Sequence, residues 1–268
     1  MSISKHHILR IRGEDQESIE DTLIIEEPLE IRLWYTDAIK GRIHKTLSIT
    51  MRTPGHDEEL ALGFLFTENI IESFDQIEET TQVNPNVIKV SIKENIPLDL
   101  SKLDRHFYTT SSCGVCGKAS LEALSTAGAS AIQKNNFSPS QESLLKLNTN
   151  LKSLQHIFNE TGGNHGIALF NLEGEISLVY EDVGRHNAMD KLIGHCLINK
   201  QLPLHQHGLL VSGRASFELM QKALMAGCPM LVAVGAPSSL AVELAEEFNM
   251  SLIGFLGDNG YNLYNISN

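Results

Sequence analysis

Residues 208–256 read GLLVSGRASFELMQKALMAGCPMLVAVGAPSSLAVELAEEFNMSLIGFL, and this stretch decides the fold. Three short apolar runs within it, GLLVSG, MLVAVG and SLIGFL, are separated by two segments with helical patterning. Short buried strands that alternate with helices are typical of a sheet that helices cover on both faces. The stretch therefore predicts a largely parallel α/β sheet.

The same pattern extends toward the N-terminus. Residues 187–199 predict a further helix, and the runs 166–171 and 175–181 predict two strands. Glu173 and Gly174 lie between these strands and form a short turn signal. We therefore expect the two strands to pair as a hairpin.

The first half of the chain has a different texture. Period-two alternation in residues 24–35 and 44–52, and the run NVIKVSI at 86–92, favour strands. Residues 57–70 predict a buried helix with acidic residues near its start. This mixture predicts an α+β arrangement without regular alternation.

We place a domain boundary near residue 138, because the pattern changes there and residues 138–158 predict one long helix. A chain of 268 residues is long enough for two domains. The expected fold class is α/β. A smaller α+β domain at 1–138 ends in the loop of a cysteine pair and the helix after it, and a three-layer α/β/α domain occupies 139–268.

Composition and charge narrow the class of protein. The chain is 42% hydrophobic with a net charge of −12, and Lys and Arg form no long run, which argues against nucleic-acid binding. Apolar runs such as 230–236 are too short to cross a bilayer, and residues 1–20 lack the apolar core of a secretory signal. We therefore expect a cytoplasmic protein that binds neither membranes nor nucleic acids. An anionic small ligand remains compatible with this charge where cations converge.

Four cysteines are too few for a disulfide framework in a chain of this length. Cys196 and Cys228 have apolar neighbours and are expected to be small core residues. Cys113 and Cys116 lie in the run TTSSCGVCGKAS (109–120) and are the candidates for chemistry.

The cysteine pair alone is compatible with several roles. A structural zinc site needs about four ligands, and no second pair accompanies this one, so we expect no structural metal. Ser112 precedes Cys113 at the position where the zinc deaminase signature has proline, which argues against a zinc deaminase. A dithiol oxidoreductase would place the pair at the start of a helix, as residues 118–128 allow, and there the helix dipole would lower a cysteine pKa. Gly114 and Gly117 instead favour a loop, in which a cysteine thiolate could carry a group between two partners. The remaining alternative is a loop without chemical function.

Two predicted strand-to-helix turns gather polar residues. The first, within 180–194, contains Glu181, Asp182, Arg185, His186, Asn187, Asp190 and Lys191. The second, within 212–227, places Ser212, Gly213 and Arg214 before a helix. Open α/β sheets bind ligands at the carboxyl ends of their strands, and arginine suits phosphate, so we expect a ligand site here. His186 is a candidate hydrogen-bond partner, and ordinary helix capping is the better interpretation for Asp182 alone.

These turns, together with SSCGVCGKASLEAL (111–124), resemble the formate dehydrogenase accessory sulfurtransferase family (FdhD/NarQ). The likeness extends to EEPLEIR (26–32), to MRTPGHDEELALGFLFTENII (51–71) and to the run 226–256. It covers most of the chain in the expected order, and this combination is far more specific than the cysteine pair alone.

The resemblance implies a homodimeric sulfurtransferase whose second domain is similar to the cytidine deaminase fold without its zinc chemistry. Members of the family take persulfide sulfur from a cysteine desulfurase. They pass it to the molybdenum of the bis(molybdopterin guanine dinucleotide) cofactor, which formate dehydrogenase then receives. Cys113 corresponds to the persulfide carrier, and Cys116 is expected to assist it.

The resemblance also implies that the loop after the last predicted strand binds the guanine dinucleotide. Its residues here are Phe255, Leu256, Gly257, Asp258, Asn259 and Gly260. Many members carry an arginine soon after this strand, whereas this chain has Gly257 and Asp258. We therefore expect phosphate binding to depend more on Arg185 and Arg214.

Two rival functions belong to other classes. A non-catalytic chaperone would bind and protect the finished molybdenum cofactor and use the cysteine pair for docking. A dithiol oxidoreductase would cycle Cys113 and Cys116 between thiols and a disulfide.

Overall fold

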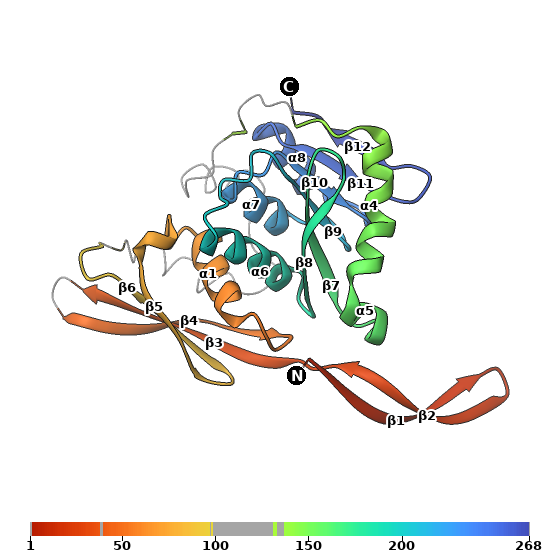
Figure 1. Cartoon of the computed structure of the whole chain (residues 1–268), viewed down its shortest axis with the longest axis horizontal. Coiled ribbons are helices and arrows are strands. Elements are labelled where there is room, and N and C mark those ends of the chain that lie inside the picture. The colour runs from red at the N-terminus through yellow and green to blue at the C-terminus, as the bar shows by residue number, and fades with distance from the viewer. Residues whose placement is uncertain (1, 38–39, 97, 99–130, 133–136, 268) are drawn as a thin grey trace.

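The computed structural model describes residues 2–37, 40–96, 98, 131–132 and 137–267 (Figure 1). The described strands form three sheets, of two, four and six strands. Figure 1 shows helices on both sides of the largest sheet, a second sheet beside α1 (Asp57–Thr67), and a hairpin that extends away from both. No helix in the described part of the chain is long and apolar enough to cross a membrane.

The N-terminal hairpin consists of β1 (Ile3–Arg12) and β2 (Asp15–Ile24), which pair antiparallel along their whole length. Sequence patterning did not reveal it. Most of its side chains are at least partly exposed on both faces, and Ile11 is 62% exposed. Because neither face is buried, no alternation of apolar and polar residues is imposed on these strands.

The four-stranded sheet has the order β4 (Gly41–Arg52), β3 (Glu27–Asp37), β6 (Val87–Ile92) and β5 (Ile77–Asn84). Three of its strands and α1 confirm the predicted elements at 24–35, 44–52, 86–92 and 57–70. The inward side chains of β3 and β6 pack with the apolar side chains of α1 in one core. Strand β5 was missed, because it is a mostly polar and exposed edge strand.

The six-stranded sheet has the order β12 (Asn262–Asn265), β11 (Ser251–Gly254), β10 (Met230–Ala233), β9 (Gly208–Val211), β7 (His165–Phe170) and β8 (Ile176–Asp182). Strands β9, β10 and β11 are parallel, as predicted. The other three pair antiparallel with their neighbours, so the expectation of a largely parallel sheet is wrong for half of it. The predicted hairpin β7–β8 is confirmed, and its short turn forces the two strands to run in opposite directions.

Helices cover both faces of this sheet, as predicted. Helices α6 (Arg185–Ile198), α7 (Phe217–Met225) and α8 (Ser239–Glu247) pack on one face, and α4 (Gln141–Leu154) packs on the other. The predicted long helix at 138–158 is in fact two, because Gln155 leaves helical geometry (φ −82°, ψ 79°) before α5 (His156–Thr161) begins. The likeness to the cytidine deaminase fold stays a prediction.

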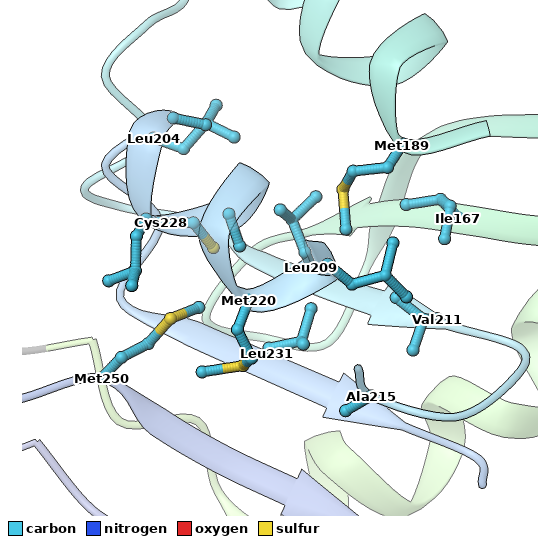
Figure 2. Close-up of a cluster of buried hydrophobic side chains, with 14 of the residues drawn as sticks. Ile167, Met189, Leu204, Leu209, Val211, Ala215, Met220, Cys228, Leu231 and Met250 are labelled. Atoms are coloured by element: carbon cyan, nitrogen blue, oxygen red, sulfur yellow. The ribbon is translucent and has the colours of Figure 1, made fainter. Parts of the chain in front are cut away.

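The core between the sheet and α6–α8 contains the two cysteines outside the predicted cysteine-pair loop. Figure 2 shows interleaved side chains from its strands and helices, among them Ile167, Met189, Leu209, Met220 and Leu231. Cys196 and Cys228 are fully buried, as expected, and burial raises the pKa of each thiol to about 12. Both are therefore protonated, unreactive thiols near neutral pH.

Helix α1 packs against α6 at a crossing where two glycines meet backbone. A Cβ atom on Gly194 would lie 1.8 Å from the carbonyl oxygen of Glu59, and one on Gly63 would lie 1.9 Å from that of Asp190. These distances leave no room for a side chain, so the two helices touch through their backbones. The predicted boundary near residue 138 stays a prediction, and the segments on its two sides share this interface.

We expect the change Gly194→Ala to destabilise the protein by about 3 kcal/mol or more, because overpacking against rigid backbone forces the helices apart. Urea unfolding followed by circular dichroism measures this change. Gly260→Ala is the control, since a Cβ atom there would have nothing within 4 Å, and its unfolding midpoint should match the parent's. Equal midpoints for Gly194→Ala and the parent would contradict the close crossing.

Candidate functional site

The polar residues singled out in the sequence meet at one edge of the six-stranded sheet. Strand β7 runs antiparallel to both β8 and β9, so the start of β7 lies at the edge where β8 and β9 end. Strands β10 and β11 are parallel to β9 and end at the same edge. We call this the strand-end edge. It contains the turns after β8, β9 and β10 and the loop after β11.

The turn after β8 is held by Asp182, which is fully buried. One of its carboxylate oxygens accepts hydrogen bonds from Gly184 N at 2.8 Å and Asn187 Nδ2 at 3.1 Å. The other accepts from Thr53 N at 3.1 Å and pairs with Lys191 Nζ at 2.7 Å. These contacts satisfy the buried charge and leave it no capacity for a ligand, so capping is the better interpretation of Asp182.

Asn187, Asp190 and Lys191 are buried as well, and none of them faces a ligand. The amide of Asn187 also donates to Met51 O at 2.7 Å, and Asp190 pairs with Lys222 at 2.9 Å. Glu181 accepts from the N–H groups of Ile157 and Phe158 at 2.9 Å and so caps α5. The residues of the first turn that remain for a ligand are Arg185 and His186.

Arg185 and Arg214 are the cations of the site. Arg185 is half-buried at the start of α6, and Arg214 is exposed between β9 and α7. Neither guanidinium hydrogen-bonds to another described residue or lies within ion-pair distance of a described carboxylate. A Cβ atom on Gly235 would lie 3.0 Å from Cγ of Arg214, so the arginine stem lies against the turn after β10. Two unpaired guanidinium groups at one edge are suited to a phosphate-bearing ligand.

His186 faces Glu218 of α7. Its Nε2 atom lies 2.8 Å from a carboxylate oxygen, although the geometry is too poor for a hydrogen bond, so the contact is a charge pairing by distance only. Contact with His186 is the main reason that the pKa of Glu218 is lowered. A direct role of His186 toward a ligand stays a prediction.

Ser212 and Gly213 end β9 and have different roles. The hydroxyl of Ser212 accepts from Gly166 N at 2.9 Å, so it closes the sheet rather than facing outward. Gly213 lies beside a histidine of β7, described below. Helix α7 begins at the end of this turn, and the hydroxyl of Ser216 before it is buried without a partner among the described residues. The first amides of α6 and α7 therefore lack side-chain caps, as anion-binding helix starts do.

His165 is a site residue that sequence reasoning missed. It begins β7, pairs across the sheet with Asp182, and its Nδ1 atom lies 3.4 Å from the position of a Cβ atom on Gly213. Its ring nitrogens make no hydrogen bond to another described residue. Burial lowers the pKa of His165, and the nearby charges of Arg185 and His186 lower it further. Only the strand order could have revealed it, because in sequence His165 lies far from both turns.

The loop after β11 reaches the same edge. Phe255 N donates to Gly235 O at 3.1 Å, and Gly235 N donates to Gly213 O at 2.9 Å. The segments that follow β9, β10 and β11 are therefore connected through their backbones. Phe255 is 51% exposed and has a positive φ of 53°, which is a strained conformation for a bulky residue. Leu256 is buried in the core, so only its backbone is available to a ligand.

The remaining residues of the loop are exposed or half-exposed, and its carboxylate is directed elsewhere. Gly257 N donates to Gly260 O at 2.9 Å, which closes the loop, and Asn259 is exposed. Asp258 accepts from Asn148 Nδ2 at 3.1 Å and lies 3.5 Å from the hydroxyl of Thr149, both on α4. The negative charge that replaces the family's arginine is therefore directed toward α4.

A depression at another place on the molecule is acidic and suits an anion poorly. It has a volume of about 600 Å³ and lies at the start of α1, lined in part by Glu27, Arg52, Asp57, Glu58 and Glu59. The guanidinium of Arg52 is already paired with a carboxylate, because its Nε and Nη2 atoms each donate to Asp57 at 2.9 Å. The strand-end edge, with its unpaired cations, is the better candidate site.

Cys113 and Cys116 lie outside the residues that the structure describes, so their chemistry and surroundings stay predictions. Within the described ranges, no three histidine, cysteine or carboxylate side chains gather as a metal site would require.

Comparison with known proteins agrees with the resemblance in the sequence. The model of the FdhD/NarQ family matches residues 25–268. Curated relatives named sulfur carrier protein FdhD include one from Streptomyces avermitilis, which is 46% identical over 97% of this chain and 93% of its own. Another, from Sulfurisphaera tokodaii, is 40% identical over 98% of this chain and 97% of its own.

A solved structure supports the fold. The crystal structure of a formate dehydrogenase accessory protein from Desulfotalea psychrophila superposes with a TM-score of 0.76 and covers 99% of this chain and 98% of that one. At 21% identity this likeness concerns the fold alone. Because the family model spans most of the sequence and the relatives align over nearly their full length, the chain belongs to the FdhD/NarQ family.

Proposed function

We propose that this protein is a sulfur carrier that serves a molybdenum cofactor. It takes persulfide sulfur from a cysteine desulfurase and holds it on Cys113. It then delivers the sulfur to the molybdenum of bis(molybdopterin guanine dinucleotide), which formate dehydrogenase receives. The observation that carries the ligand part of this proposal is the pair of guanidinium groups of Arg185 and Arg214 at the strand-end edge, which make no hydrogen bond or ion pair with a described residue. The names of the relatives support the sulfur part.

The sulfur step needs only cysteine chemistry. The Cys113 thiolate attacks the outer sulfur of the donor persulfide, the donor's S–S bond breaks, and the donor cysteine leaves as a thiolate. Cys113 then carries the outer sulfur as its own persulfide. In one variant of the release step, Cys116 attacks the inner sulfur. Sulfide then leaves toward the metal, and a Cys113–Cys116 disulfide remains for a thiol reductant to reopen. In the other variant, Cys116 only protects the site between cycles.

The cofactor is bound as a substrate through its nucleotide end. Arg185 and Arg214 would contact the pyrophosphate from two sides, and the uncapped first amides of α6 and α7 would add hydrogen bonds. The exposed ring of Phe255 is available for stacking with guanine, an interaction worth about 1–3 kcal/mol per base. These contacts hold one end of the cofactor and leave the metal end free for Cys113.

Local charge is essential because the chain as a whole repels anions. The net charge is −12, so a polyphosphate can bind only where cations outnumber carboxylates. We further propose that the protein acts as a homodimer in the cytoplasm. The two rivals, a non-catalytic cofactor chaperone and a dithiol oxidoreductase, differ from the proposal in what happens to Cys113.

Incubation with a persulfide donor should add the mass of one sulfur atom to Cys113 and to no other residue. Cys196 and Cys228 serve as internal controls, because their raised pKa values leave almost no thiolate near neutral pH. Intact-mass and peptide mass spectrometry after donor removal measures the adduct, and Cys113→Ser should abolish it.

The same spectra separate the rivals. An oxidoreductase would lose two hydrogen atoms across Cys113 and Cys116 instead, and a chaperone would show neither change. Loading of Cys196 or Cys228 in the native protein would contradict the assignment of Cys113. Metal analysis of the same sample tests for zinc, and one zinc ion per chain bound through the cysteine pair would revive a structural role.

Replacing either arginine should weaken nucleotide binding. A charge-assisted hydrogen bond is worth about 1.5–3 kcal/mol, so Arg214→Ala and Arg185→Ala should each raise the Kd of GDP roughly tenfold or more. Isothermal titration of the full chain measures this, and added salt should weaken binding to the parent because part of the contact is exposed.

Lys146→Ala is a matched control, since it removes an exposed cation that is already paired with Glu142 on α4. Its affinity for GDP should equal the parent's. If both arginine variants bind GDP as tightly as the parent, the nucleotide does not sit at the strand-end edge.

A further inference from the structure

The two Gly-Arg turns are not neighbours in the sheet. Strand β7 lies between β8 and β9, so the turn that leads to Arg185 and the turn that contains Arg214 flank the start of β7. The residue at that position is His165. Its strand pairs on one side with β8, where its partner is Asp182, and on the other with β9, which leads into Gly213. A ligand that touches both arginines must therefore pass over His165.

The surroundings of His165 leave its ring available to that ligand. Gly213 has no side chain, and a Cβ atom there would lie 3.4 Å from His165 Nδ1, so the missing side chain keeps this side of the ring open. The ring is half-buried and makes no hydrogen bond within the described part of the chain. The charged or titratable groups that act on it are Arg185, His186 and Asp182. Arg214 follows Gly213 in the chain, and Glu218 faces His186.

Most of these groups are already committed to other partners. The Asp182 carboxylate is saturated by four donors, and Glu218 faces His186. The two arginines make no hydrogen bond and no close ion pair with a described residue, although the charge of Arg185 also acts on Glu218. In the free protein, burial lowers the pKa of His165, and the neighbouring Arg185 and His186 lower it further, so the neutral imidazole is favoured near pH 7.

We propose that His165 contacts the pyrophosphate of the bound dinucleotide, and that its imidazole takes up a proton from solvent when this ligand binds. The proposal rests on the proposed function, because it takes the anion to lie between Arg185 and Arg214. The ligand's negative charge compensates both arginines and favours the charged imidazole, which then donates a hydrogen bond to a phosphate oxygen. No covalent bond changes, and the only transfer is one proton from water or buffer to the ring.

The sign of the pH dependence follows from this linkage. A group that is neutral in the free protein and protonated in the complex makes binding tighter as pH falls between its two pKa values. The histidine thus distinguishes a dinucleotide anion from a neutral ligand, because a neutral ligand has no negative charge to stabilise the protonated imidazole.

The test is isothermal titration of the full chain with diguanosine pyrophosphate near neutral pH, in two buffers of different ionisation enthalpy. The bridging pyrophosphate of this probe does not titrate near neutral pH. Any net proton uptake calculated from the binding enthalpies in the two buffers is therefore due to the protein. The parent should take up a substantial fraction of one proton. His165→Gln should still bind, with several-fold lower affinity and with no proton uptake. Proton NMR of the His165 ring should show its pKa rising in the complex.

A control variant locates the effect. His205→Gln removes an exposed imidazole that precedes β9 at the opposite edge of the sheet, and it should retain proton uptake. His165→Asn is a second replacement in case the glutamine variant folds poorly.

The outcomes separate this inference from the proposed function. If the parent binds the probe without taking up protons, or if uptake persists in His165→Gln, the inference about His165 is wrong while the arginine site stands. If the parent does not bind the probe at all, the strand-end site and the inference fail together.

Discussion

The buried carboxylate of Asp182 is the constraint on which the rest of the site depends. A buried charge is costly unless it is fully paired, and this one is paired by donors from three separate places in the chain. Thr53 belongs to the segment before α1, Gly184 to the turn after β8, and Lys191 to α6. One side chain thus joins the first half of the chain to the sheet and fixes where α6 begins. Arg185 is the first residue of α6. The contacts that pair the Asp182 carboxylate therefore also fix the position of Arg185.

A second set of contacts makes this junction rigid. The glycine crossing of α1 and α6 brings the two backbones into contact. Beside it, Lys222 of α7 donates to both carboxylate oxygens of Asp190 and to the hydroxyl of Thr67. Helices α1, α6 and α7 are therefore held to one another by backbone contact and by a buried ion pair. Helices α6 and α7, which present amino ends without side-chain caps to the strand-end edge, are both members of this unit. A ligand site built on them is positioned by the core rather than by surface loops.

Much of the fold could be predicted from the sequence, and the failures share one cause. Buried faces impose periodicity, so the strands and helices of 166–256 and the helix α1 are readable as patterns. Strands β1, β2 and β5 have little or no buried face and gave no pattern. The direction of β7 and its place between β8 and β9 depend on pairing between distant segments, which no local pattern encodes. Arg185 and Arg214 could be proposed from sequence because each follows a predicted strand end, whereas the placement of His165 between them depends on strand order. Cys113 and Cys116 were predicted from sequence alone, and they stay a prediction because they lie outside the described residues.

Asp258 stands near the position where the resemblance in the sequence implies an arginine, and the contacts of this loop bear on that difference. The replacing carboxylate, Asp258, accepts hydrogen bonds from α4, so its charge is directed toward the face opposite α6 and α7. What the loop presents to the strand-end edge is the exposed ring of Phe255, held at a positive φ by its backbone contact with Gly235. An aromatic ring binds a base by stacking, which depends little on charge, whereas an arginine there would bind phosphate. In the proposed function, different parts of the chain would therefore bind the two parts of the nucleotide. The loop after β11 would stack on the base, and His165 with the two arginines around β7 would bind the negative charge.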